Sequence, residues 1–129
     1  MSLILVADDE SHIVQVLALK FRNAGHDVME AGDGEEALEI IRDHRPDVLV
    51  TDMQMPFMNG IELARALLDD PETASMPVLI LTARGWAMDD CIATLANVKS
   101  VQSKPFSPRE ILSLVEGLMD ESGQRSNCS

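Results

Sequence analysis

Five side chains with obvious chemistry stand at or just after the ends of short strand-like segments in this chain. They are Asp8, Asp9, Asp52, Thr82 and Lys104. In an open parallel sheet, the carboxyl ends of the strands form one edge, and ligands bind at that edge. We therefore expect three carboxylates, one hydroxyl and one ammonium to converge on one small site. This combination of groups suits a hard cation together with a phosphoryl group.

The segments that position these side chains predict five strands, over residues 3–7, 27–31, 47–51, 77–82 and 98–103. The first, third and fourth are continuously apolar at their centres, which is typical of strands covered on both faces of a sheet. The second and fifth are more polar, so we expect them at the two edges of the sheet.

Apolar residues at helical spacing predict helices after each strand, over residues 11–24, 34–44, 59–69, 86–96 and 107–119. Five consecutive strand–helix units predict an α/β fold, with a parallel sheet and helices on both of its faces. We expect one domain over residues 1–120. The polar segment 121–129 is expected to be a disordered tail.

Bulk properties narrow the classes of function. The formal net charge of −12 and the pI near 4.4 argue against direct binding to nucleic acid or to an anionic membrane. We expect neither a signal peptide nor a membrane span, and the cysteines and histidines lack zinc-ligand spacing. Two cysteines, one of them in the polar tail, fit free thiols in a reducing compartment, and we expect a cytoplasmic protein.

Four short motifs, each at its own strand end, resemble the receiver domain of two-component response regulators, of the single-domain kind found in chemotaxis regulators. The motifs are Asp8-Asp9-Glu10, Asp52-Met53-Gln54-Met55-Pro56-Phe57-Met58-Asn59-Gly60, Leu81-Thr82-Ala83 and Lys104-Pro105-Phe106. Each motif alone is weak, but their order and separations match the family over residues 2–119. The resemblance implies a flavodoxin-like (βα)5 fold with strand order 2-1-3-4-5.

The resemblance also implies a catalytic role for Asp52. Its carboxylate would accept a phosphoryl group and become an acyl phosphate. Mg²⁺, or Mn²⁺ as an alternative, would be bound by Asp8, Asp9, Asp52 and the backbone carbonyl of Gln54. Because three carboxylates this close repel one another, at least one of their pKa values should be raised. For Glu10 we favour a solvated side chain over a third acidic neighbour of the site.

Further roles follow from the same resemblance. Lys104 would stabilise charge on the transferred phosphoryl group, and the peptide bond between Lys104 and Pro105 would be cis, which aims the lysine inward. The hydroxyl of Thr82 would bind the phosphoryl group and draw the following loop with it. Ala83 would leave room for the donor, and Arg84, like Gln54, would tune the lifetime of the acyl phosphate.

Position 101 departs from the family pattern. Family members usually carry Tyr or Phe three residues before the lysine, whereas this chain has Val101 there and no tyrosine at all. The phosphorylation chemistry should survive this change. It leaves open how a signal reaches the face formed by segments 86–96, 98–103 and 107–119.

The resemblance implies a phosphorelay module rather than a classical enzyme, since it would catalyse only its own phosphorylation and dephosphorylation. The expected partners are a histidine kinase or histidine phosphotransfer protein, and a downstream protein or fused output domain. The chain would be either a stand-alone receiver or one excised from a longer regulator or hybrid kinase. The main alternative is a receiver-fold interaction domain that acts independently of phosphorylation. An aspartyl-phosphate phosphatase and a flavin binder fit the motifs less well.

Overall fold

The computed structural model describes residues 2–55, 57–82, 95–104 and 106–128. Five parallel strands form one sheet in the order β2-β1-β3-β4-β5. Their bounds are β1 Leu3–Ala7, β2 Asp27–Ala31, β3 Val48–Asp52, β4 Val78–Thr82 and β5 Val98–Ser103. Each strand lies within one residue of its predicted bounds, and the predicted flavodoxin-like strand order is confirmed.

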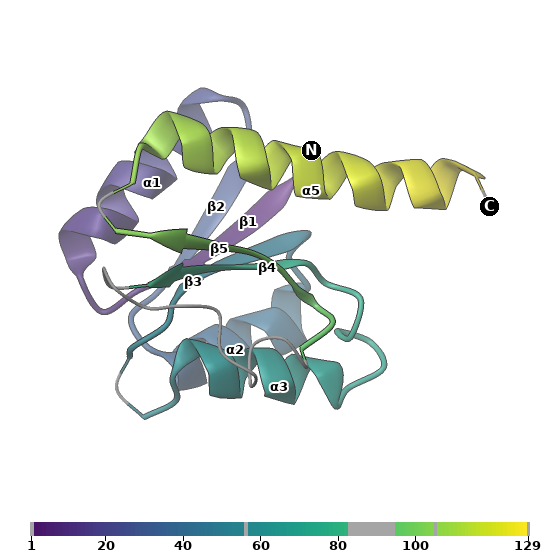
Figure 1. The fold of residues 1–129 in the computed structure, drawn as a ribbon, viewed down its shortest axis with the longest axis horizontal. Helices are drawn as coiled ribbons and strands as arrows, with labels where there is room; N and C mark the ends of the chain where they lie inside the picture. Colours follow the sequence, from purple (N-terminus) through teal and green to yellow (C-terminus); the bar gives the residue numbers. More distant parts are fainter. Residues whose placement is uncertain (1, 56, 83–94, 105, 129) are drawn as a thin grey trace.

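Four helices are described: α1 Ser11–Asn23, α2 Gly34–His44, α3 Gly60–Leu68 and α5 Pro108–Cys128. Figure 1 shows α1 and α5 covering one face of the sheet and α2 and α3 covering the other. The helix predicted over residues 86–96 lies largely outside the described residues. Among the helices that are described, none combines the length and the apolar character that crossing a bilayer requires.

Two hydrophobic cores lie on opposite faces of the sheet. Along β1, Ile4 and Val6 pack in the core with α1 and α5, whereas Leu5 and Ala7 pack in the core with α2 and α3. This alternation follows from the two-residue period of a strand. Because both faces are covered, every residue of β3 and of β4 is buried, which explains why these strands are apolar or uncharged up to Asp52 at the end of β3.

The edge strands are β2 and β5, as their polar composition predicted. In β2 only Ala31 is buried, and no residue of β5 is buried. An edge strand meets a neighbour on one side only, so polar side chains are tolerated there.

The end of the last helix differs from the sequence expectation. The predicted helix ended at residue 119, and residues 121–129 were expected to be disordered, but α5 continues to Cys128. No proline follows Pro108, and each added residue of a helix contributes a further backbone hydrogen bond. The C-terminal part of α5 extends beyond the sheet (Figure 1). The boundary expected at residue 120 is therefore not marked by a break in secondary structure.

Candidate functional site

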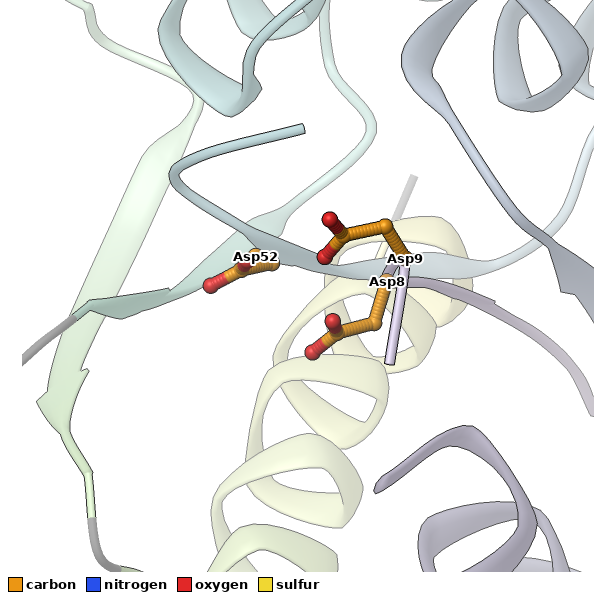
Figure 2. Close-up of side chains that lie close together, drawn as sticks. All are labelled: Asp8, Asp9 and Asp52. Atoms are coloured by element: carbon orange, nitrogen blue, oxygen red, sulfur yellow. The ribbon is translucent and has the colours of Figure 1, made fainter. Parts of the chain in front are cut away.

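Three carboxylates meet at the carboxyl end of the sheet. Because β1 and β3 pair with Ala7 opposite Thr51, the residues that come next, Asp8 and Asp52, are neighbours. One carboxylate oxygen each from Asp8, Asp9 and Asp52 lie within 4.8 Å of one another. Figure 2 shows the three side chains gathered at this edge, with their carboxylates turned to the same side. Asp8 and Asp52 are buried, whereas Asp9 is exposed.

Lys104 reaches the same place from the far side of the sheet. Its backbone N–H donates to the Thr82 carbonyl at 2.8 Å, which continues the pairing of β5 with β4. Its Nζ atom lies 3.1 Å from Asp52 Oδ1 and 3.5 Å from Asp8 Oδ2. One ammonium therefore bridges the ends of β1 and β3.

Glu10 is a third partner of this ammonium. Its Oε1 atom lies 3.1 Å from Lys104 Nζ, although nearly half of the Glu10 side chain is exposed. The sequence favoured a solvated Glu10, and the structure adds an ion pair that this reading missed. The only signal in the sequence was the position of Glu10 directly after Asp8 and Asp9.

Two carboxyl groups of the site, those of Asp8 and Asp52, have raised pKa values. Burial raises the pKa of Asp8 to about 6; repulsion from Asp52 adds to this, while the Glu10 N–H, 2.9 Å from Asp8 Oδ1, and the charge of Lys104 oppose it. Burial also raises the pKa of Asp52, against the hydrogen bond and charge of Lys104. The direction agrees with the raised pKa expected from the sequence, but burial rather than repulsion between the carboxylates is its main cause. A bound divalent cation would favour the ionised carboxylates and lower both pKa values.

The same negative charges also raise the pKa of Lys104, which favours its charged form. Burial lowers its pKa, but the hydrogen bond from Lys104 to Asp52 and the charge of Asp8, together with Glu10, outweigh burial, and the pKa is raised. The ammonium therefore stays protonated at neutral pH. It is available as a fixed positive charge in the site.

Thr82 closes β4 one residue beyond Leu81, the partner of Asp52 in the sheet register. The residue is fully buried, and its hydroxyl donates to the sulfur of Met53 at 3.9 Å, a long contact of the weak kind typical of thioethers. Met53 in turn donates its N–H to the Leu81 carbonyl at 2.8 Å. The hydroxyl is therefore held beside the residue that follows Asp52.

The turn after Asp52 is fixed by close backbone packing. A Cβ atom added to Gly60 would lie 2.5 Å from the Asp52 carbonyl oxygen, so only glycine fits there without displacement. The N–H of Gly60 donates to the Met53 carbonyl at 2.9 Å. Asn59 and Glu62 then form a capping box at the start of α3. These contacts hold Asp52 against the site.

The remaining predicted residues fall into two groups. Val101 is half-buried in β5 opposite Ile80 and packs against the core shared with α2 and α3. Gln54 is exposed directly after Met53, and the ligand role of its carbonyl stays a prediction. Ala83, Arg84 and Pro105 lie outside the described residues.

An open pocket of about 190 Å³ adjoins the carboxylates. Its walls come from the end of β1, the start of α1 and the end of β2: Asp8, Asp9, Ser11, Val14, Gln15, Glu30, Ala31 and Gly32. The sequence did not predict this pocket, because it depends on how far the start of α1 stands from β2. It leaves open space beside Asp9.

A sequence model described as the response regulator receiver domain matches residues 4–116. Among curated proteins, the alkaline phosphatase synthesis transcriptional regulatory protein PhoP of Bacillus subtilis is 36% identical, over 92% of this chain and 49% of that protein. The phosphate regulon transcriptional regulatory protein PhoB of Pseudomonas aeruginosa is 33% identical, over 93% of this chain and 52% of that protein. The chain thus spans about half the length of the curated relatives it matches.

Solved structures give the same match over nearly whole chains. The receiver domain of the Francisella response regulator 1452 is 33% identical with a TM-score of 0.85, covering 95% of this chain and 99% of that one. The chemotaxis response regulator CheY4 of Vibrio cholerae is 29% identical with a TM-score of 0.83, covering 92% and 98%. The sheet that carries the three carboxylates in this chain therefore has the same fold as these solved receiver structures.

Proposed function

This chain belongs to the response regulator receiver family, and we propose that it accepts a phosphoryl group from a phosphohistidine donor onto Asp52. The observation that carries the proposal is the position of the Lys104 ammonium, 3.1 Å from Asp52 Oδ1 and 3.5 Å from Asp8 Oδ2, beside the three clustered carboxylates. A fixed cation beside a nucleophilic carboxylate is what phosphoryl transfer to an acid group requires.

The donor set also suits a divalent cation. Three carboxylate oxygens within 4.8 Å of one another are the hard ligands that Mg²⁺ prefers, and Mn²⁺ accepts the same set. Asp8, Asp9 and Asp52 would hold the ion, with the Gln54 carbonyl as a further ligand. Bound there, Mg²⁺ would neutralise charge on the carboxylates and on the incoming phosphoryl group.

In the proposed reaction, an oxygen of Asp52 attacks the phosphorus in line with the leaving group. The new bond joins that oxygen to phosphorus, while the bond between phosphorus and the donor's imidazole nitrogen breaks. The electron pair of the broken bond stays on the imidazole, which gains a proton. Lys104 favours the ionised form of Asp52 before the attack and then binds a phosphoryl oxygen, which stabilises the transition state.

Thr82 carries the proposed switch. Once a phosphoryl group is present, its hydroxyl donates to a phosphoryl oxygen in place of the weak contact with the Met53 sulfur. That movement would draw the chain after Thr82 and alter the face formed by the region between β4 and β5, by β5 and by α5. Val101, half-buried against the core, would stay in place where the family usually has a moving aromatic ring.

We place a histidine kinase or histidine phosphotransfer protein upstream of this site. Downstream, the signal would pass to another protein or to a fused output domain. The curated relatives, named transcriptional regulatory proteins, are about twice as long as the segment that this chain matches. In this proposal the chain acts as a signalling module, and its chemistry is limited to gaining and losing its own phosphoryl group.

The test is intact mass spectrometry after incubation with acetyl phosphate and Mg²⁺. Wild type should gain one phosphoryl group, and EDTA or Asp52→Asn should prevent the gain. Asp43→Asn is a matched control, because this exposed aspartate on α2 lies away from the site. No adduct on wild type, together with no binding of beryllofluoride, would contradict the proposal and favour an interaction domain that acts independently of phosphate.

A further inference from the structure

Phe57 is an exposed aromatic residue in the loop between Asp52 and α3. Its side chain is 80% exposed, the largest exposed fraction among the large hydrophobic residues of the described chain. Its neighbours behave differently: Met53 is buried, and Met55 and Met58 pack against the core shared with α2 and α3. Phe57 contributes to neither core of the described residues. Folding of the domain therefore does not explain a phenylalanine at this position.

The backbone of Phe57 is also unfavourable. Its φ angle is +69°, in the left-handed region that glycine adopts readily and that a bulky side chain rarely adopts. Close packing of the following residues, Met58 and Gly60, restricts the backbone conformation at Phe57. The carbonyl of Met58 packs so closely on Gly34 that a Cβ atom there would clash with it, and Gly60 is locked against Asp52. Glycine at position 57 would meet the same demand with less strain.

The location of Phe57 suggests what its ring contacts. Asp52 is only 6% exposed, so a protein that brings a phosphohistidine to it must press against the rim of the site. Much of that rim is acidic: Asp9 and Glu10 are exposed beside it, in a chain of net charge −12. Phe57 belongs to the loop that joins Asp52 to α3, and its exposed ring offers a docking contact that does not depend on charge. Buried aromatic residues are frequent anchors of protein interfaces.

We infer that Phe57 is the apolar anchor for the protein that delivers the phosphoryl group to Asp52. The fitting partner has a neutral or basic surface with an apolar pocket beside its phosphohistidine. This inference rests on the proposed function, since it needs Asp52 to be phosphorylated by a protein donor. It concerns docking alone, because a small donor such as acetyl phosphate does not need the ring.

The test compares a protein donor with a small donor on the same variants. The donors are the histidine kinases of the organism that encodes this chain, each phosphorylated with ATP, and the fastest on wild type is used. Phe57→Gly should lower kcat/KM for transfer from that kinase by roughly tenfold or more, as loss of an interface anchor does. Its rate with acetyl phosphate should stay within about twofold of wild type, and its Tm should be equal or higher, because glycine relieves the positive φ.

Two further variants separate the ring from the backbone. Phe57→Ala keeps the strained φ and should lose transfer from the kinase without gaining stability, whereas Phe57→Leu should retain most of the transfer. Phe57→Trp combined with Trp86→Phe leaves one tryptophan, whose emission should shift to the blue when the kinase binds and the ring leaves water.

The outcomes distinguish this inference from the proposed function. Equal transfer from the kinase to wild type and to Phe57→Gly would overturn the anchor role. Transfer from none of the kinases, with acetyl phosphate still active, would overturn it as well. Failure of acetyl phosphate on wild type would instead contradict the phosphoacceptor role of Asp52.

Discussion

At the scale of single residues, the site is defined by an excess of negative over positive charge. Three aspartates and Glu10 meet the ammonium of Lys104, and burial leaves Asp8 with a pKa of about 6. The folded protein therefore shifts the pKa values of Asp8, Asp52 and Lys104 from their ordinary values. Such perturbed groups are more frequent at functional sites than elsewhere, because a metal or substrate can relieve the excess charge.

The raised pKa of Asp8 predicts how stability depends on pH when no metal is present. The folded pKa is about 6 and the ordinary value is 3.8, so the folded protein binds this proton more tightly than the unfolded chain does. The contribution of Asp8 to stability therefore falls as pH rises from about 4 to about 6, and the loss persists above that range. Asp8→Asn should remove this loss and stabilise the protein at pH 7 by up to about 3 kcal/mol.

Urea denaturation of wild type and of Asp8→Asn in EDTA, from about pH 4 to about pH 8, measures the difference in their free energies of unfolding. The difference between the two proteins isolates Asp8 from the other titrating groups. Mg²⁺ should reduce the difference in free energy of unfolding between the two proteins at neutral pH. Wild type gains stability from binding the ion, and the variant gains less. Parallel stability curves for the two proteins, with and without Mg²⁺, would count against this account of Asp8.

At the scale of elements, the position of Asp52 depends on how β3 is joined to α3. Gly60 begins α3 and lies against the carbonyl of Asp52, while Asn59 caps the helix. The helix and the strand are thus packed backbone to backbone directly beside the proposed nucleophile. An element that approaches this closely transmits small displacements to the site.

Gly60→Ala should therefore impair the site, while the same change elsewhere should not. The added Cβ would lie 2.5 Å from the Asp52 carbonyl oxygen, which forces α3 or β3 to move. Gly117→Ala in α5 is the matched control, because nothing lies within 4 Å of a Cβ added there. We expect Gly60→Ala to lower the free energy of unfolding by about 1–3 kcal/mol. It should also lose most of its phosphorylation by acetyl phosphate.

Gly117→Ala should keep wild-type phosphorylation and gain about 0.5–1 kcal/mol, since alanine favours a helix over glycine. Thermal denaturation and intact mass after incubation with acetyl phosphate measure both quantities. A Gly60→Ala protein with wild-type stability and phosphorylation would show that the packing of α3 on Asp52 is not required.

At the scale of the whole molecule, one sheet covered on both faces supports the site from below. The helices α1 and α5 close one core and α2 and α3 close the other, so the strand ends are held from both sides (Figure 1). The described core contacts of α5 involve residues Ile111 to Met119. The part of α5 that extends past the sheet lies beyond these contacts.

Removal of residues 121–129 should therefore leave the domain folded. We expect the free energy of unfolding to change by less than about 1 kcal/mol, because the described core residues of α5 all remain, while helical content should fall. Circular dichroism and urea denaturation of the shortened chain measure both. A loss above about 2 kcal/mol would mean that the end of α5 stabilises the domain through contacts beyond this core.

The sequence alone determined the sheet and the edge at which its functional groups gather. Continuous apolar runs required strands covered on both faces, polar runs marked β2 and β5 as edges, and the side chains after each run shared one edge. This worked because strand and helix periods are local properties of the chain. The end of α5 was predicted less well, since polar, serine-rich composition is a weak guide to where a helix stops.

The tertiary structure alone decided the contacts and the energies. Lys104 meets Asp8 across 96 positions of sequence, and Glu10 joins them, although the sequence favoured a solvated Glu10 side chain. The pKa of Asp8 and the exposure of Phe57 depend on which atoms surround them in space. Burial, desolvation and charge–charge distances arise only when distant segments pack together, and a pattern read along the chain contains none of them.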